Sequence, residues 1–178
     1  MKRLLYITLA ILILPIVNIK AQQNIRYDSY IGTWKYTNSS TKEELTIMLK
    51  ESSVKLPQIY GGHTIKCLAG VYIYKKNGQI ILDTSNQFTD NKPANEMPIS
   101  ASNSSNTDPS KLVLSVRDYG KMKNGRPKTG SGLLISVSST NPKKIRWQIG
   151  DSEGAYIAGT APPVGFSIPT DVIFTKVE

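Results

Sequence analysis

The sequence predicts an all-β protein folded as an antiparallel barrel, with a β-sandwich as the alternative. Apolar and polar residues alternate in four stretches, at 45–50, 112–116, 133–137 and 145–149, as in half-buried strands. No stretch beyond the first 21 residues carries apolar residues at helical spacing. Asn77-Gly78 lies between two strand-like stretches and is the preferred sequence of a two-residue hairpin turn. Alternation requires only one buried face, so both architectures remain open.

The Asn77-Gly78 turn also predicts which residues of its hairpin share a face. A type I′ turn pairs Lys75 with Ile80, Ile73 with Leu82 and Val71 with Thr84. Most of these side chains are aliphatic, so we expect this face to meet the core, together with Cys67 and Ala69. The opposite face is expected to be solvated or to line a ligand, and it carries Tyr72, Tyr74, Ile81 and Asp83.

The N-terminus is predicted to be a signal peptide over residues 1–21. Lys2-Arg3 precedes an apolar run over 4–17, and the small residue Ala21 precedes a polar stretch. We expect a signal helix that is cleaved after Ala21, with an uncleaved N-terminal anchor as the alternative. Ile19 is not small, which leaves the cleavage site open. The chain is therefore expected to be secreted, to the periplasm or beyond the cell surface of a Gram-negative bacterium.

The remaining residues, 22–178, have the length of a single domain. Removing the signal lowers the formal net charge from +9 to +6, because the signal holds three basic residues and no acidic one. This charge favours contact with anionic surfaces and equally serves solubility. Cys67 is the single cysteine, so no internal disulfide or lipid anchor at the signal is expected. We expect a buried, inert thiol and a monomer without a membrane span in the mature chain.

Two connecting segments stand out by composition. Residues 85–110 are rich in Asn, Ser, Thr, Asp and Pro and are predicted to form a long polar loop. Residues 117–128 carry five basic residues and one acidic residue, and Asn124-Gly125 marks a turn. A long basic loop between two strands is expected there. The chain closes on a β-branched strand over 172–177.

Catalytic motifs are weak throughout the sequence. His63 is the single histidine, which leaves no histidine-based metal cluster. A Ser-x-x-Lys motif works when a helical turn joins its ends, but Ser52 and Lys55 lie in a strand-like run. Glu43 and Glu44 are neighbours whose side chains point to opposite faces of a strand. We therefore expect no enzyme and no catalytic, cofactor-binding or metal-ligating residues.

Gly32-Thr33-Trp34 stands at the head of the predicted domain. This Gly-x-Trp motif resembles the start of the first strand in lipocalin-like (calycin) β-barrels. The resemblance implies that Trp34 closes one end of the barrel and stacks against a basic side chain from a late strand, with Arg146 and Lys176 as candidates. The alternative is that Trp34 is an ordinary large core residue.

A wider resemblance covers most of the mature chain in order. It rests on IGTWKY (31–36), GVYIYKKNG (70–78) and GFSIPTDVIFTK (165–176), and on a signal ending in Lys20-Ala21-Gln22. Together these segments resemble a family of small exported bacterial proteins that are a domain of unknown function. The resemblance implies an exported β-domain and no particular activity.

These observations lead to two functional hypotheses from different classes. The first is a lipocalin-like binding module that holds a small apolar or amphipathic ligand in the barrel. The alternative is an envelope interaction or structural domain that presents the loops at 85–110 and 117–128 to an anionic envelope component. Export makes nucleic acid an improbable partner. A hydrolytic role is a weaker, third hypothesis, because the sequence offers no recognisable nucleophile and base.

Overall fold

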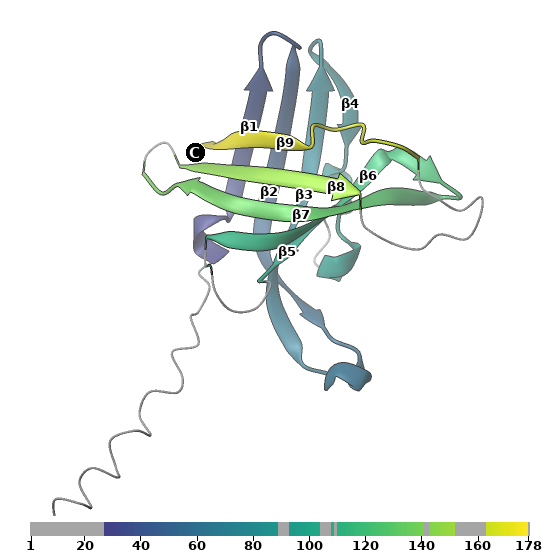
Figure 1. The fold of residues 1–178 in the computed structure, drawn as a ribbon. Coiled ribbons are helices and arrows are strands. Elements are labelled where there is room, and N and C mark those ends of the chain that lie inside the picture. Colours follow the sequence, from purple (N-terminus) through teal and green to yellow (C-terminus); the bar gives the residue numbers. More distant parts are fainter. Residues whose placement is uncertain are drawn as a thin grey trace, which may run out of the picture.

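The structure is a computed structural model that describes residues 27–88, 93–103, 108, 110–140, 143–151 and 163–177 (Figure 1). The segment predicted as a signal peptide, residues 1–21, lies outside the described residues. Its role in export therefore stays a prediction.

The described residues form one antiparallel sheet with short 3-10 helices at its connections. The strands are β1 (Gly32–Asn38), β2 (Glu43–Lys55), β3 (Thr64–Lys76), β4 (Gln79–Asp83), β5 (Ile99–Ser102), β6 (Lys111–Lys123), β7 (Arg126–Ser138), β8 (Lys144–Asp151) and β9 (Asp171–Val177). The 3-10 helices are η1 (Tyr27–Ser29), η2 (Gln58–Tyr60), η3 (Ser85–Gln87) and η4 (Ala94–Glu96).

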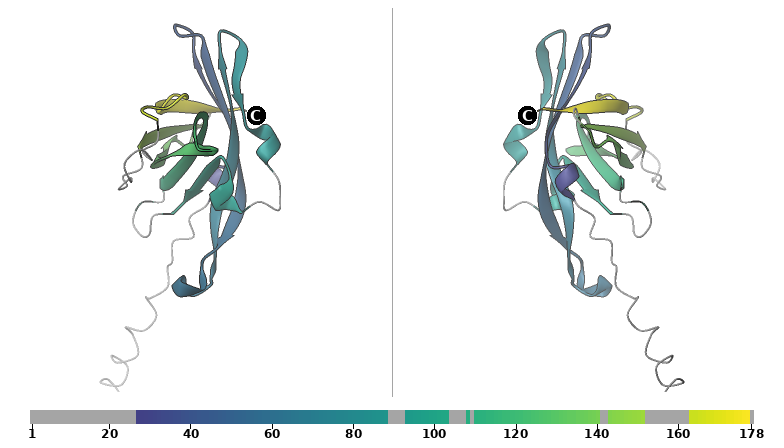
Figure 2. Two further views of the ribbon diagram at one scale, coloured as in Figure 1. Left: turned by 90° about the vertical axis from the view of Figure 1, so that its right-hand side faces the viewer. Right: turned by 90° about the vertical axis from the view of Figure 1, so that its left-hand side faces the viewer.

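The sheet closes on itself, so the prediction of a barrel is confirmed and the sandwich alternative is wrong. Eight strands form the ring in the order β1-β2-β3-β5-β6-β7-β8-β9, and β9 pairs with β1. In Figures 1 and 2, β1–β4 form one wall and β5–β9 cross it at a steep angle. The walls meet at two short corners, where Thr33–Lys35 pair with Thr175–Val177 and Leu68–Gly70 pair with Ile99–Ala101. Strands must tilt strongly to close a small barrel, which accounts for the crossing.

The barrel interior is filled by large side chains that lie in one contiguous core. Trp34, Trp147, Tyr72 and Phe174 are fully buried there. The Trp147 and Phe174 rings meet edge to face, with ring centroids 5.4 Å apart. Interior positions alternate along each strand as the sequence predicts, for example at Leu45, Ile47 and Leu49 in β2.

The faces predicted for the β3–β4 hairpin are reversed in the structure. Asn77 and Gly78 form the expected turn with positive φ, and Lys75 pairs with Ile80 as predicted. A bulge between Tyr74 and Lys75 then places Ile73 opposite Asp83 rather than Leu82. Tyr72 and Tyr74 point into the barrel core, whereas the odd positions lie on the outer face. A second apolar cluster buries that outer face, so both faces of β3 are apolar.

The second cluster, called here the outer cluster, packs against the outside of β2 and β3. Phe88, Ala94 and Met97, from either side of residues 89–92, lie over these strands, and Figure 2 shows the short helices η3 and η4 beside the wall. The buried members are Cys67, Ala69, Val71, Ala94 and Met97, and the half-buried members are Met48, Val54 and Phe88. Cys67 is a buried free thiol as predicted, although it lies outside the barrel rather than in its core.

Both predicted loops contain regular structure. Residues 85–110 include η3, η4 and β5. The short strand β5 pairs with β3 on one side and with β6 on the other, and its residues Ile99 and Ala101 point into the core. In residues 117–128, β6 and β7 run up to the Asn124-Gly125 turn, where both residues have positive φ. Asp118 and Lys128 lie opposite each other in this pairing and are buried, and the register shifts between Asp118 and Met122.

Candidate binding site

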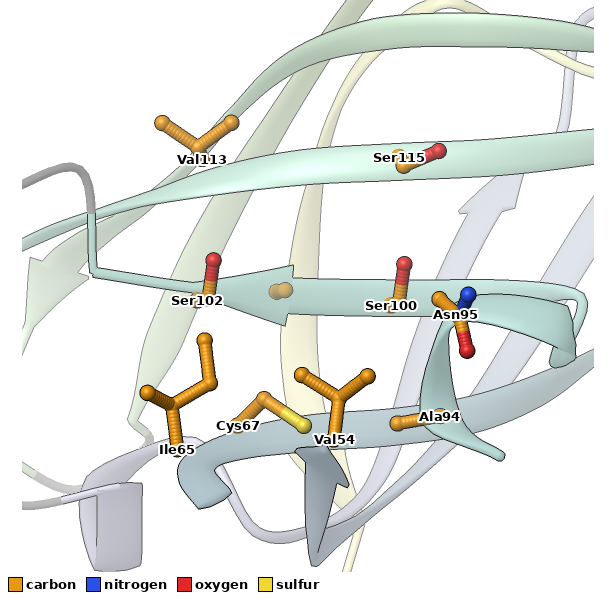
Figure 3. A pocket seen from close by; sticks show the side chains of 10 residues that line it. Val54, Ile65, Cys67, Ala94, Asn95, Ser100, Ser102, Val113 and Ser115 are labelled. Atoms are coloured by element: carbon orange, nitrogen blue, oxygen red, sulfur yellow. The ribbon is translucent and has the colours of Figure 1, made fainter. Parts of the chain in front are cut away.

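A small apolar pocket lies on the outer face of the barrel, at the edge of the outer cluster (Figure 3). It encloses about 150 Å³ between the β2–β3 pair, η4 and the strands β5 and β6. The lining residues are Val54, Ile65, Cys67, Ala94, Asn95, Ser100, Ala101, Ser102, Val113 and Ser115. No charged side chain is among them.

One side of the pocket is apolar because β2 and β3 continue past the barrel wall as a paired extension. Their pairing runs on to Lys55 and Thr64, and the extension ends in η2, at the lower end of the molecule in Figure 1. Val54 and Ile65 are direct partners in this pairing and point to the outer face. Ile65 is 38% exposed, so the apolar wall is open to solvent on one side.

The other side of the pocket carries hydroxyl groups from β5 and β6. Ser100 and Ser115 are direct partners, and Ser115 is in turn opposite Ser131 on β7. The three positions form a row of hydroxyls across neighbouring strands. Within the described residues, the side chains of Ser100, Ser102 and Ser115 make no hydrogen bond. These pocket hydroxyls are therefore available to another molecule.

Cys67 contributes its sulfur atom to the pocket, next to Val54 in Figure 3. Burial raises the pKa of the Cys67 thiol above its usual range. The thiol therefore stays protonated near neutral pH and is a poor nucleophile. Its contribution to the pocket is that of a small apolar group.

The Gly-x-Trp motif lies at the start of β1, and its tryptophan belongs to the barrel core. The Trp34 Nε1 donates a hydrogen bond of 2.7 Å to the Tyr30 carbonyl. The Lys176 Nζ lies 5.5 Å from the Trp34 ring centre, which confirms Lys176 as its cationic partner. Arg146 instead forms a two-bonded ion pair with Asp171 on the surface. The close approach needs Gly32, since a Cβ there would lie 2.9 Å from Lys176 Cε.

Residues 163–170, called here the strap, pack against the barrel core through Ile168 and Phe166. The Asp118 carboxylate accepts hydrogen bonds from the Ser167 backbone N–H at 2.6 Å and from the Ser167 hydroxyl. The Lys128 Nζ donates to the Pro163 carbonyl at 2.7 Å, pairs with Asp151 and lies 4.6 Å from the Phe166 ring centre. Two buried charges of opposite sign thus hold the strap from adjacent strands.

A family of unknown function, DUF6705, matches this sequence over residues 1–177. The chain belongs to this family. Neither the curated proteins nor the solved structures contain a match. Membership agrees with the resemblance seen in the sequence, and the eight-strand closed barrel agrees with the lipocalin-like start at Gly32 and Trp34. In the part of the chain that the structure describes, no helix is long and apolar enough to cross a membrane.

The weak catalytic motifs of this DUF6705 chain are not brought together. Glu43 accepts a hydrogen bond of 2.7 Å from the Tyr74 hydroxyl, whereas Glu44 pairs with Lys35 at 2.7 Å on the other face. Ser52 and Lys55 lie in the extended strand β2. Among the described residues, no group of three or more His, Cys, Asp or Glu side chains is arranged to hold a metal.

Sequence reasoning missed the pocket because its two walls come from segments with different signals. Val54 and Ile65 look like ordinary alternating strand residues, and Ser100 and Ser102 lie in a stretch that reads as a polar loop. The signal that could have found β5 is Ile99 and Ala101, two apolar residues with strand spacing inside that polar stretch. Four residues are too few to stand out by periodicity.

Proposed function

We propose that this chain is a small exported binding module, and that it takes an apolar group of a ligand in the outer-face pocket. The observation that carries the proposal is the pocket itself, with Val54, Ile65 and Cys67 on one side and unpartnered hydroxyls on the other. Concave sites that combine apolar walls with a few polar groups are the usual form of small-molecule sites. Secretion is part of this proposal and rests on the basic and apolar pattern of residues 1–21.

The packing of the barrel favours the outer pocket over the interior. Lipocalin-like binding would place the ligand among the core side chains, where the described positions hold Trp34, Trp147 and Phe174 at 1% exposure or less. A ligand there would have to displace several of these side chains, and closely packed interiors resist such changes. The outer pocket needs no displacement. We therefore keep the hypothesis of an apolar or amphipathic ligand, but place the ligand in the outer pocket instead of the barrel interior.

The size of the pocket sets the expected affinity. A cavity of about 150 Å³ accommodates a group as large as benzene. Burying about six carbon groups contributes on the order of 5 kcal/mol before the costs of association. Small probes that fill only the pocket should thus bind with dissociation constants in the millimolar range, at roughly 1 mM or weaker.

Benzene binding to matched variants tests the proposal. Ser102→Leu places a branched side chain in the pocket, whereas Ser131→Leu places the same side chain on the same outer face beyond it. We expect saturable benzene-induced NMR shifts at Val54, Ile65 and Val113 in the original protein and in Ser131→Leu. Ser102→Leu should abolish them. Shifts that centre on core residues such as Leu45 and Leu112, or that survive Ser102→Leu, would contradict the proposal.

The tip of the β6–β7 hairpin favours a second candidate function, docking to an anionic envelope component. Lys123 and Arg126 lie opposite each other beside the turn, Lys121 precedes them, and Met122 is 46% exposed. Arg117 and Lys128, farther from the turn, bind the Asn95 and Pro163 carbonyls of this chain. This candidate requires that Lys121→Glu combined with Arg126→Glu lowers binding to anionic vesicles, and unchanged binding would exclude it.

A further inference from the structure

We infer that the ligand of the outer-face pocket is a neutral amphiphile, in which an uncharged hydrogen-bonding group adjoins an apolar end. The inference rests on the proposed function and specifies its ligand. Three features of the pocket carry it: the order of its apolar and polar walls, the absence of charge in its lining, and the unused hydrogen-bonding capacity of its serines.

The walls are arranged so that an apolar end and a polar group of one molecule can be held together. Val54, Ile65 and Cys67 form the apolar side, from β2 and β3. Ser100 and Ser102 lie on β5, which pairs directly with β3 at Leu68–Gly70, and neighbouring strands are about 4.8 Å apart. Figure 3 shows Ile65, Cys67 and Val54 on one side and the serines on the other, with Val113 beside Ser115 on the serine side. A molecule a few bonds long therefore reaches from one side to the other.

The lining contains no group that would balance a ligand charge. Its polar members are Asn95, Ser100, Ser102 and Ser115, all neutral. Arg117 follows on β6 and donates a hydrogen bond of 2.7 Å to the Asn95 carbonyl, but its side chain is not part of the lining. A carboxylate or ammonium placed against the apolar side would lose hydration without gaining an opposite charge. An alcohol, ester or glycoside avoids this cost.

The serine hydroxyls can each donate one hydrogen bond and accept others. Ser100, Ser102 and Ser115 use none of this capacity in side-chain hydrogen bonds within the described residues. A purely apolar ligand would leave them partly desolvated without a partner, which is unfavourable. A ligand with a hydroxyl or ether group would satisfy them. The serines therefore favour an alcohol over a purely apolar molecule, and the uncharged lining favours it over a charged molecule of the same chain length.

A series of six-carbon probes tests this preference by NMR titration of the purified protein at neutral pH. The probes are 1-hexanol, hexanoate and hexylammonium, with benzene as the apolar reference. We expect 1-hexanol to bind at least about tenfold more tightly than either charged probe. Ser100→Ala combined with Ser115→Ala should weaken 1-hexanol binding about two- to tenfold and should not weaken benzene binding, because benzene makes no hydrogen bond to these serines. Ser131→Ala, in the same serine row but beyond the pocket, is the matched control and should change neither.

The outcomes separate this inference from the function on which it rests. If hexanoate or hexylammonium binds as tightly as 1-hexanol, or if the double alanine variant keeps its full affinity for 1-hexanol, the neutral amphiphile is ruled out while benzene binding still supports the pocket. If neither benzene nor 1-hexanol binds the original protein, both the inference and the proposed function fail.

Discussion

Three tyrosines show how single residues join the core of this barrel to its rims. The Tyr30 hydroxyl donates to the Ser110 carbonyl at 2.6 Å, and the Tyr72 hydroxyl donates to the Arg117 carbonyl at 2.9 Å. The Tyr74 hydroxyl donates to Glu43 at 2.7 Å. Each ring is buried while its hydroxyl reaches a polar group, which satisfies both parts of the side chain.

Burial of these rings predicts a loss of stability at alkaline pH. Desolvation raises the pKa of Tyr30 and that of Tyr74 to about 12, from the ordinary 10.0, and raises the pKa of Tyr72 as well. The pKa values of these tyrosines are higher in the folded protein than in the unfolded chain. Their contribution to the free energy of unfolding is therefore fully present below about pH 10 and is lost as the pH rises towards 12. Urea denaturation between pH 8 and 12 should show this fall.

Tyr30→Phe provides the control for the alkaline prediction. It removes one of the three ionising groups, so its free energy of unfolding should fall less steeply above pH 10 than that of the original protein. Tyrosinate absorbance of the folded protein should also show groups that ionise well above pH 10. Ionisation of all tyrosines near pH 10 in the folded state would contradict the burial seen here.

The sequence left open whether Trp34 stacks on a basic side chain, with Arg146 and Lys176 as candidates, or is an ordinary core residue. The structure decides for Lys176 because it lies directly opposite Trp34 in the β1–β9 pairing. Arg146 lies between Ile145 and Trp147, which both point into the core, so its own side chain points outward. Strand parity alone would have excluded Arg146. Identifying Lys176 required knowing that the last strand pairs with the first.

At the scale of elements, the strap shows how an irregular segment is fixed to a regular sheet. The Asp118 carboxylate accepts hydrogen bonds from the backbone N–H groups of Ser167 and Gly120 at 2.6 and 2.9 Å. Gly120 also allows the strap to lie close, since a Cβ there would meet the Ser167 side chain. The strap contributes Ile168 to the core, so its attachment adds to the packing of the barrel.

Asp118→Asn should therefore destabilise the protein strongly. Asn supplies one acceptor oxygen and turns a donor toward groups that are themselves donors, which leaves buried N–H groups without partners. We expect a loss of about 2 to 4 kcal/mol in the free energy of unfolding by urea denaturation. The amide hydrogen of Ser167 should also exchange faster with solvent.

Asp171→Asn is the matched control for the strap. Asp171 also accepts several hydrogen bonds, from Arg146 and Gln148, but on an exposed surface. Exposed ion pairs contribute little to stability, so Asp171→Asn should lower the free energy of unfolding by no more than about 1 kcal/mol. Equal losses for the two variants would show that the Asp118 contacts do not hold the strap.

The elements that the sequence predicted are those with a strong local signal. Both Asn-Gly turns, at Asn77 and Asn124, form where expected, because few other residues accept the positive φ that these turns need. The bulge at Tyr74 and the strand β5 were missed, since both depend on neighbours distant in sequence. The local sequence also could not show which face of β3 points into the barrel, because apolar residues occupy both faces.

At the scale of the molecule, closure and the outer pocket have a common origin. The barrel closes through two corners of three residue pairs each, and β2 and β3 are longer than the ring requires. Their surplus length carries Val54 and Ile65 past the wall, beside β5. Phe88, Ala94 and Met97 then pack on this outer face in the outer cluster. Alternating patterns in the sequence show neither the strand pairings at the corners nor the extension of β2 and β3. The pocket therefore becomes visible only in the closed fold.

The central claim is that apolar molecules bind outside the barrel wall and not within it. Crystals of the protein pressurised with xenon test it most directly, because xenon enters small apolar sites without specific chemistry. We predict a xenon atom in the outer pocket, against Cys67, Val54 and Ile65, and no xenon among the core side chains around Trp34 and Phe174. Xenon inside the barrel with none in the outer pocket would contradict the account.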